Sequence, residues 1–149
     1  MKSTSVFLST LLKNLNVDNA YLNGDQDQKE REFILNEFIK SKFNVLITTD
    51  IGSRGIDVVD IDLVINYDVP QTHKDYIHRV GRTARAGKTG LAITIVTQYD
   101  IPQFQKIEYM INKKLECYIF DKKYKHLADK IDDLKSKIKE EVKMDKYNK

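Results

Sequence analysis

The side chains best suited to chemistry in this chain lie between His78 and Gly87, where Arg79, Arg82 and Arg85 stand within seven residues. The planar guanidinium group of arginine, called a fork below, is always charged and pairs bidentately with phosphate oxygens. Three such groups beside glycines therefore suit a polyphosphate. The chain has only five arginines against 20 lysines. Since lysine would serve surface solvation as well, the choice of arginine here favours phosphate recognition over a merely solvated surface.

Other polar and glycine residues follow the expected strands. Gly24 and Asp25 come after an expected strand at 19–22. The segment from Asp50 to Asp57 follows an expected strand at 44–49, and Asp68 follows one at 63–67. In open α/β sheets, ligands bind in the crevice beyond the carboxyl ends of the strands. These loops are therefore expected to belong to the functional site.

Alternating strands and helices predict an α/β domain. Three continuous apolar and β-branched runs predict a parallel sheet with helices on both faces. The expected strands are 19–22, 44–49, 63–67 and 91–96, and the expected helices are 3–16, 27–40, 73–84 and 100–114. Asp27 is expected to cap the second helix.

The positive charge is concentrated in the last part of the chain. Residues 1–112 carry 13 Lys and Arg against 14 Asp and Glu, whereas residues 113–149 carry 12 Lys against eight Asp and Glu. Any binding of RNA or nucleotide by the first part would therefore have to come from locally placed groups. The last part could add salt-sensitive attraction to a polyanion, or it could be a solvated Lys-rich helix.

An apolar seam marks a charged C-terminal helix. Its residues recur at helical spacing and are Leu127, Ile131, Leu134 and Ile138. The repeats are too few for a coiled coil, so the helix could pack on the domain, pair with a partner or stand alone. We divide the chain into a domain over residues 1–118 and a Lys-rich helical tail over residues 119–149.

Several classes of protein are disfavoured by what the sequence lacks. It has no stretch of 18 apolar residues and no secretory signal pattern, so no membrane association is expected. Its one cysteine, Cys117, forms no internal disulfide, which favours a reducing compartment. The three histidines and the cysteine do not have metal-ligand spacing, and we assign no metal site.

Four motifs, in order, resemble those of the second RecA-like domain of DEAD-box RNA helicases, and the resemblance covers about residues 3–118. The first three are Gly24-Asp25 with Gln28-Lys29-Glu30-Arg31 (Gln-x-x-Arg), Thr48 to Asp57 (motif V), and Asp62 to Asp68 with Pro70. The fourth is His78 to Arg85 (motif VI), in which Ala84 replaces the Gly of many members. We expect this replacement to have little effect, because Ala84 is compatible with a helical turn.

The resemblance implies roles in ATP hydrolysis. Arg82 and Arg85 would reach the terminal phosphate of ATP bound on a partner domain, with Arg85 as the arginine finger. Asp57 would accept hydrogen bonds from the ribose, although a turn cap is the alternative for this residue. Gly55 would let the backbone approach the nucleotide.

The resemblance also implies an RNA site. The matching positions are Gly24, Gln28, Arg31 and Thr49. In the family these positions hold the sugar–phosphate backbone, so RNA binding without base specificity is expected. For Arg31, a salt bridge to Asp27 or Glu32 is the alternative.

The expected partners are RNA and an N-terminal RecA-like domain. Arg54 and His78 resemble contacts between the two domains, and we expect a monomer. The segment from Thr97 to Ile101, with Thr83-Ala84-Arg85, resembles the branch associated with ribosome assembly. The protein is therefore expected inside the cell, in the nucleus or nucleolus, with the cytoplasm as the alternative.

Two parts of the family pattern are missing from the sequence. The motif IV strand, which would lie between strands 63–67 and 91–96, does not precede Met1. We therefore expect an apolar slot in the sheet or a rearrangement, and a truncated chain. The first domain is also missing, with its Walker A loop, its Asp-Glu-Ala-Asp motif and the ligands of Mg²⁺.

The function expected from these features is that of the C-terminal half of an ATP-dependent RNA helicase, which uses ATP and separates short duplexes locally. The chain alone is expected to be inactive. The alternative is a free-standing, non-catalytic module that binds RNA or a helicase. A third alternative, a scaffold whose tail helix docks a partner, is disfavoured. It would not need Arg82, Arg85 and Asp57, to which the resemblance gives roles with ATP.

Overall fold

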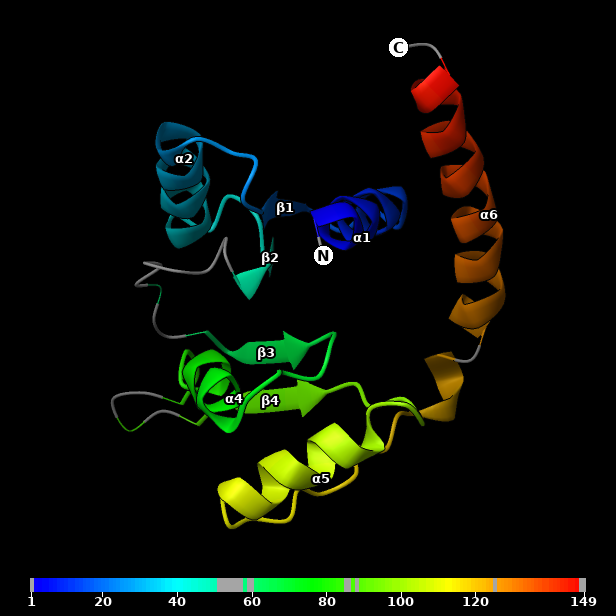
Figure 1. Cartoon of the computed structure of the whole chain (residues 1–149). Helices are drawn as coiled ribbons and strands as arrows, with labels where there is room; N and C mark the ends of the chain where they lie inside the picture. The colour runs from blue at the N-terminus through cyan, green and yellow to red at the C-terminus, as the bar shows by residue number, and fades with distance from the viewer. Residues whose placement is uncertain are drawn as a thin grey trace. The chain divides into compact units, whose positions relative to one another are not determined.

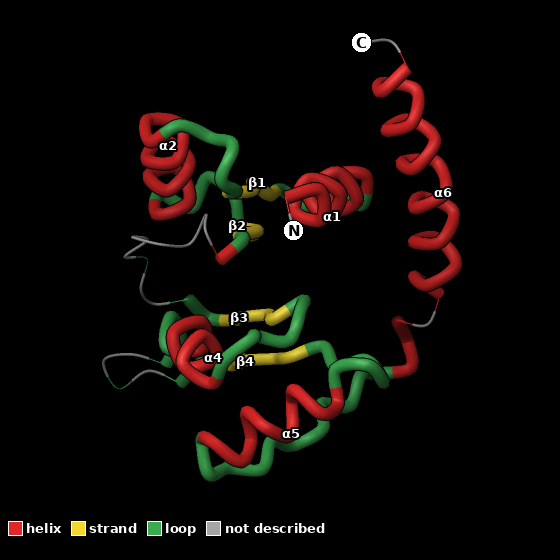
Figure 2. Tube along the Cα trace, in the orientation of Figure 1, coloured by secondary structure: helices red, strands yellow, loops and turns green. Residues whose placement is uncertain are grey.

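The structure is a computed structural model that describes residues 2–50, 58, 61–84, 87, 89–124 and 126–147 (Figures 1 and 2). The chain forms two compact units. One unit comprises Met1–Ile56 and Phe120–Lys149, and the other comprises Asp57–Ile119. None of the described helices is long and apolar enough to cross a membrane.

The first unit is built on two parallel strands. Its elements are α1 (Lys2–Asn14), β1 (Asn19–Leu22), α2 (Gln28–Ile39), β2 (Val45–Thr48), a short 3-10 turn η1 (Lys122–Tyr124) and α6 (His126–Tyr147). β1 and β2 pair in register from Asn19 with Val45 to Leu22 with Thr48. α1 contacts both strands and α2 contacts β1 (Figure 1).

A buried polar pair fixes α1 against β1. Ser9 donates its hydroxyl hydrogen to Oδ1 of Asn19 at 2.7 Å, and Nδ2 of Asn19 donates back to the Ser9 carbonyl at 3.2 Å. Both side chains are buried. Each polar group thus finds a partner inside the protein, which removes the penalty for burying it.

The charged C-terminal helix α6 packs against α1. Ile138, near the middle of α6, is only 2% exposed. Leu127, Ile131 and Leu134 are partly buried, while most of their described neighbours on α6 are exposed. The apolar seam therefore forms the contact side of the helix. Of the three arrangements that the sequence left open, the structure has the one in which the tail packs on the domain.

The second unit also contains a parallel pair. Its elements are β3 (Leu63–Asn66), α4 (His73–Val80), β4 (Leu91–Thr94) and α5 (Ile101–Met110). β3 and β4 pair in register from Leu63 with Leu91 to Asn66 with Thr94.

The core of the second unit lies where α4 and α5 meet. Val69, Tyr76 and Ile107 form its buried centre. The partly buried residues around them are Val80, Val96, Phe104, Ile111 and Leu115. Burial raises the pKa of the Tyr76 hydroxyl because the phenolate would lose its hydration. The neutral phenol is the form favoured in this core, where the ring packs with Val69 and Ile107.

The α/β class and the parallel pairing of strands are confirmed. A single continuous sheet was expected, whereas the described strands form two two-stranded sheets. β3 and β4 hydrogen-bond directly, so the expected slot between them is absent and a rearrangement takes its place. Leu63, Ile65 and Leu91 share one face of this pair and remain exposed, and α4 contacts β3.

Candidate functional site

The four positions expected to bind RNA lie at the carboxyl ends of β1 and β2 or in the first turn of α2. Thr49 directly follows β2, and its backbone N–H donates to the Leu22 carbonyl at the end of β1 at 3.1 Å. Gly24 is exposed in the turn two residues beyond Leu22. The parallel register thus places the loops of Gly24 and Thr49 at the same edge of the first unit.

The turn that contains Gly24 is held by its neighbours. The Asn23 backbone N–H donates to Oε1 of Gln26 at 2.9 Å, and Nε2 of Gln26 donates to the Tyr21 carbonyl at 3.0 Å. The Asp25 N–H donates to Oδ1 of Asn23, which is buried. These bonds fix the turn from inside and leave Gly24 exposed at its tip.

α2 presents the other two positions. Oδ1 of Asp27 accepts from the Glu30 N–H at 2.8 Å, which confirms the predicted cap. Gln28 is exposed, and its Nε2 donates to Oε1 of Glu32 at 2.8 Å. Arg31 is partly exposed in the first turn. The positive end of the helix dipole lies beside these two positions, which are expected to bind RNA.

In the second unit, α4 carries the start of motif VI. Thr72 caps this helix, since its Oγ1 accepts from the Asp75 N–H at 3.1 Å and donates to Oδ2 of Asp75 at 2.7 Å. His78 is exposed in the last turn. The exposed position of His78 leaves its imidazole accessible at the end of the helix.

Removal of the Thr72 cap should destabilise α4. Thr72→Ala is expected to lower the free energy of unfolding by about 1 kcal/mol, because the Asp75 N–H loses its partner. Urea unfolding of the 149-residue chain would measure the change. Gln71→Ala, at the exposed preceding residue, is the matched control and should have little effect. An equal loss in both variants would contradict the role of the cap.

α4 ends at Val80, four residues before the predicted end. The Gly81 N–H donates to the Ile77 carbonyl at 2.8 Å, and a Cβ on Gly81 would also lie 2.8 Å from that oxygen. Glycine therefore closes the helix, and Arg82 lies in the turn beyond it. The Arg82 carbonyl accepts from the Ile61 N–H at 3.2 Å, which anchors this turn to the start of β3.

Ala84 does not lie in a helical turn. Its φ is 55°, in the left-handed region that favours glycine. The expectation that this replacement of glycine fits a helix is wrong, because α4 ends before it reaches Ala84. The residue adopts its backbone conformation at a cost that the contacts of the turn must offset.

Arg79 forms a tether between α4 and the end of β3 through hydrogen bonds to other residues of the chain. Its Nη1 donates to Oδ1 of Asn66 at 3.3 Å and to the Asp68 carbonyl at 3.1 Å. Asn66 is only 1% exposed, and its Nδ2 donates to Oγ1 of Thr94 at 3.1 Å. These bonds tie α4 to the ends of β3 and β4. The sequence feature that could have indicated this role is Asn66, a polar residue in an otherwise apolar strand.

Four of the expected site residues lie outside the described part of the chain. They are Arg54, Gly55, Asp57 and Arg85. Their roles remain predictions from the sequence. Within the described residues, no group of three or more His, Cys, Asp or Glu side chains could hold a metal ion.

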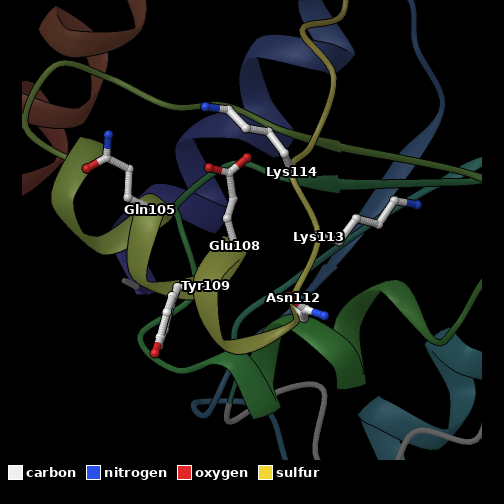
Figure 3. A pocket seen from close by; sticks show the side chains of 6 residues that line it. All are labelled: Gln105, Glu108, Tyr109, Asn112, Lys113 and Lys114. Carbon is white, nitrogen blue, oxygen red and sulfur yellow. The ribbon is translucent and has the colours of Figure 1, made fainter.

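A shallow hollow of about 330 Å³ lies at the end of α5, away from the expected site residues in sequence (Figure 3). It is lined by Gln105, Glu108, Tyr109, Asn112, Lys113 and Lys114. Oε1 of Glu108 accepts from the Leu115 N–H at 2.7 Å, so this carboxylate stabilises the turn after the helix. None of the residues that line the hollow was expected in the site.

Known proteins resemble this chain in sequence and in fold. The model of the helicase conserved C-terminal domain matches residues 1–87. ATP-dependent rRNA helicase RRP3 of Encephalitozoon cuniculi is 53% identical over 120 residues, which are 80% of this chain and 30% of that protein. Probable ATP-dependent RNA helicase DDX47 of Mus musculus is 50% identical over 108 residues, which are 72% of this chain and 24% of that protein.

A solved structure also has a fold similar to that of this chain. E. coli DEAD-box protein SrmB, bound to regulator of ribonuclease activity A, matches with a TM-score of 0.77 and 33% identity. The match covers 81% of this chain and 71% of that chain. The chain spans between about a quarter and a third of the length of the curated relatives it matches. It belongs to the helicase conserved C-terminal domain family, as a RecA-like C-terminal domain of the DEAD-box type.

Proposed function

We propose that this chain is the C-terminal half of an ATP-dependent DEAD-box RNA helicase. It would bind the RNA backbone and supply arginines for ATP hydrolysis and for local unwinding of duplexes. The observation that carries the proposal is the placement of Gly24, Gln28, Arg31 and Thr49 at the carboxyl ends of two paired strands and the start of α2. The names of the relatives, which are ATP-dependent RNA helicases, support the same activity.

The RNA site would recognise phosphates and sugars. Backbone N–H groups near Gly24 and at the start of α2 suit phosphate oxygens, and the Arg31 fork adds a charged donor. The Gln28 amide would exchange its bond to Glu32 for one to RNA. Contacts of this kind carry no base sequence, so selection of a target would come from elsewhere in the protein.

Ribosomal RNA is the substrate class that the relatives favour, since one of them is named an rRNA helicase. The sequence of the segment from Thr97 to Ile101 points to the same ribosome-assembly branch. A nucleolar location would follow from this substrate.

The ATP site would be completed from both sides when two domains close. Arg82 and Arg85 would face the terminal phosphate, Asp57 the ribose hydroxyls, and Gly55 would allow close approach of the backbone. Mg²⁺ would be held by the N-terminal RecA-like domain, which also binds most of the nucleotide. His78 and Arg54 would contact that domain, so the chain alone should neither bind ATP tightly nor hydrolyse it.

Replacement of Arg31 tests the RNA part of this proposal. In the full-length protein, Arg31→Ala should weaken RNA stimulation of ATP hydrolysis by a similar factor for RNAs of different sequence, because a backbone contact is lost. The rate is measured against RNA concentration for several single strands and duplexes. Lys29→Ala, at an exposed neighbour on the same helix, is the matched control.

Three results would decide against parts of the proposal. A loss confined to some RNA sequences would contradict recognition of the backbone. Full stimulation in Arg31→Ala would remove this residue from the RNA site. RNA binding by the full-length protein without any ATP hydrolysis would favour the alternative, a non-catalytic module that binds RNA or a helicase.

A further inference from the structure

We propose that Gly90 is a positioning residue for the turn that presents Arg82. The inference rests on the proposed function, in which Arg82 faces the terminal phosphate of ATP. Gly90 does not touch the nucleotide in this proposal. It allows the start of β4 to pack directly on the turn, and this packing sets the position of the Arg82 backbone.

The contact between Gly90 and the turn leaves no room for a side chain. A Cβ on Gly90 would lie 2.6 Å from the Ala84 backbone nitrogen and 2.9 Å from Cβ of Thr83. It would approach Oγ1 of Thr83 more closely still. Since two of these three atoms belong to the backbone or stand next to it, a rotation of one side chain would not relieve the clash.

The segment that contains Gly90 is held in place by the pairing of β4 with β3. Leu91, the residue after Gly90, opens β4 and pairs with Leu63 of β3. The Leu91 N–H donates to the Asp62 carbonyl at 3.1 Å. A side chain on Gly90 would therefore have to push against a strand that is held by its ladder of hydrogen bonds.

Among the described residues, the turn is held at the same point by an isolated bridge between Ile61 and Thr83, where β4 has a ladder. Oγ1 of Thr83 donates to the Asp62 carbonyl at 3.4 Å, so this one oxygen accepts from both the turn and β4. The Ile61 N–H donates to the Arg82 carbonyl at 3.2 Å. Ala84 already adopts a left-handed backbone conformation. The turn is therefore the part expected to move when Gly90 gains a Cβ.

A displaced turn would misplace Arg82 where the reaction depends on its position. A shift of about 1 Å in a catalytic group can lower a rate by about a hundredfold. The RNA positions lie in the other unit of the chain, and most of the nucleotide would be bound by the other domain. A change at Gly90 should thus lower kcat and leave RNA affinity and KM for ATP nearly unchanged.

The experiment compares Gly90→Ala with wild type and with Thr89→Ala in the full-length protein. Thr89 is the exposed residue directly before Gly90, so its truncation changes the same segment without adding an atom that enters the turn. We expect kcat of Gly90→Ala to fall by about ten- to a hundredfold, with RNA affinity within about twofold of wild type. Thr89→Ala should keep the wild-type kcat. Circular dichroism and urea unfolding of each variant establish that the molecules compared are folded.

A second pair of variants identifies the contact itself. Thr83→Ala removes Oγ1, the atom closest to the added Cβ, so it should restore part of the lost kcat when combined with Gly90→Ala. Thr83→Val keeps the shape of the side chain but loses the bond to the Asp62 carbonyl. It should lower kcat severalfold, and it tests the position of the turn even if Gly90→Ala does not fold.

The outcomes separate this inference from the proposed function. Wild-type kcat in a folded Gly90→Ala, or in Thr83→Val if Gly90→Ala does not fold, would overturn the inference. So would simple multiplication of the two single effects in the double variant. If wild type hydrolyses ATP with RNA and Arg82→Ala does not, the proposed function stands whatever Gly90→Ala does. If wild type lacks RNA-stimulated hydrolysis, the proposed function itself fails.

Discussion

Replacement of Arg85 by Ala in the full-length protein should lower kcat for RNA-stimulated ATP hydrolysis by about a thousandfold or more, as for arginine fingers in other phosphoryl-transfer enzymes. The guanidinium fork would stabilise charge that develops on the transferred phosphoryl group, so its loss raises the barrier more than it weakens binding. Steady-state kinetics at saturating RNA measure the effect, and RNA affinity should change little.

Two further variants define what Arg85 contributes. Arg85→Lys keeps the charge but loses the planar fork, so it should recover little of the rate. Lys74→Ala removes one positive charge from an exposed position on α4 and should leave the rate unchanged. An unchanged kcat in Arg85→Ala would remove this residue from the mechanism. A large loss in Arg82→Ala alone would move the role of the finger to Arg82.

The second large effect is expected at the centre of the second unit's core. Ile107 is 1% exposed and packs with Val69 and Tyr76. Ile107→Ala should lower the free energy of unfolding by about 2–5 kcal/mol, because it removes buried methyl groups and leaves a cavity. Urea unfolding of the 149-residue chain, followed by circular dichroism, would measure the loss.

A matched control is available on the same helix. Ile101 opens α5 and is 46% exposed, so Ile101→Ala makes the same chemical change at a position that is largely hydrated. Its effect should stay below about 1 kcal/mol, as for most surface substitutions. Equal losses at the two positions would contradict the packing of Ile107 in the core.

Arg79 has a structural role among the three arginines between His78 and Gly87. The sequence presents three equivalent forks, whereas the structure commits one of them to Asn66 and to the Asp68 carbonyl. An arginine that makes these bonds holds α4 to the ends of the strands. In the proposed mechanism Arg82 and Arg85 serve the nucleotide, and Arg79 fixes the helix that precedes them.

Local sequence was enough to predict the elements and the motifs. Each expected strand and helix is present, because apolar periodicity and turn residues act over a few residues. The cap at Asp27 was predictable for the same reason, since its partner is three residues away. The order and spacing of the motifs also identified the family, because they are properties of the sequence alone.

The way these elements combine depends on contacts that only the folded chain makes. The direct pairing of β3 with β4, the tether of Arg79 and the contact of Gly90 with Thr83 join residues that are not sequence neighbours. Local propensity contains no information about such partners, since an arginine or a glycine has the same local preferences whatever it meets across the fold. α4 closes locally at Gly81, whereas the turn beyond it, which contains the left-handed Ala84, is held by the bond from the Ile61 N–H to the Arg82 carbonyl, a partner that local sequence does not specify.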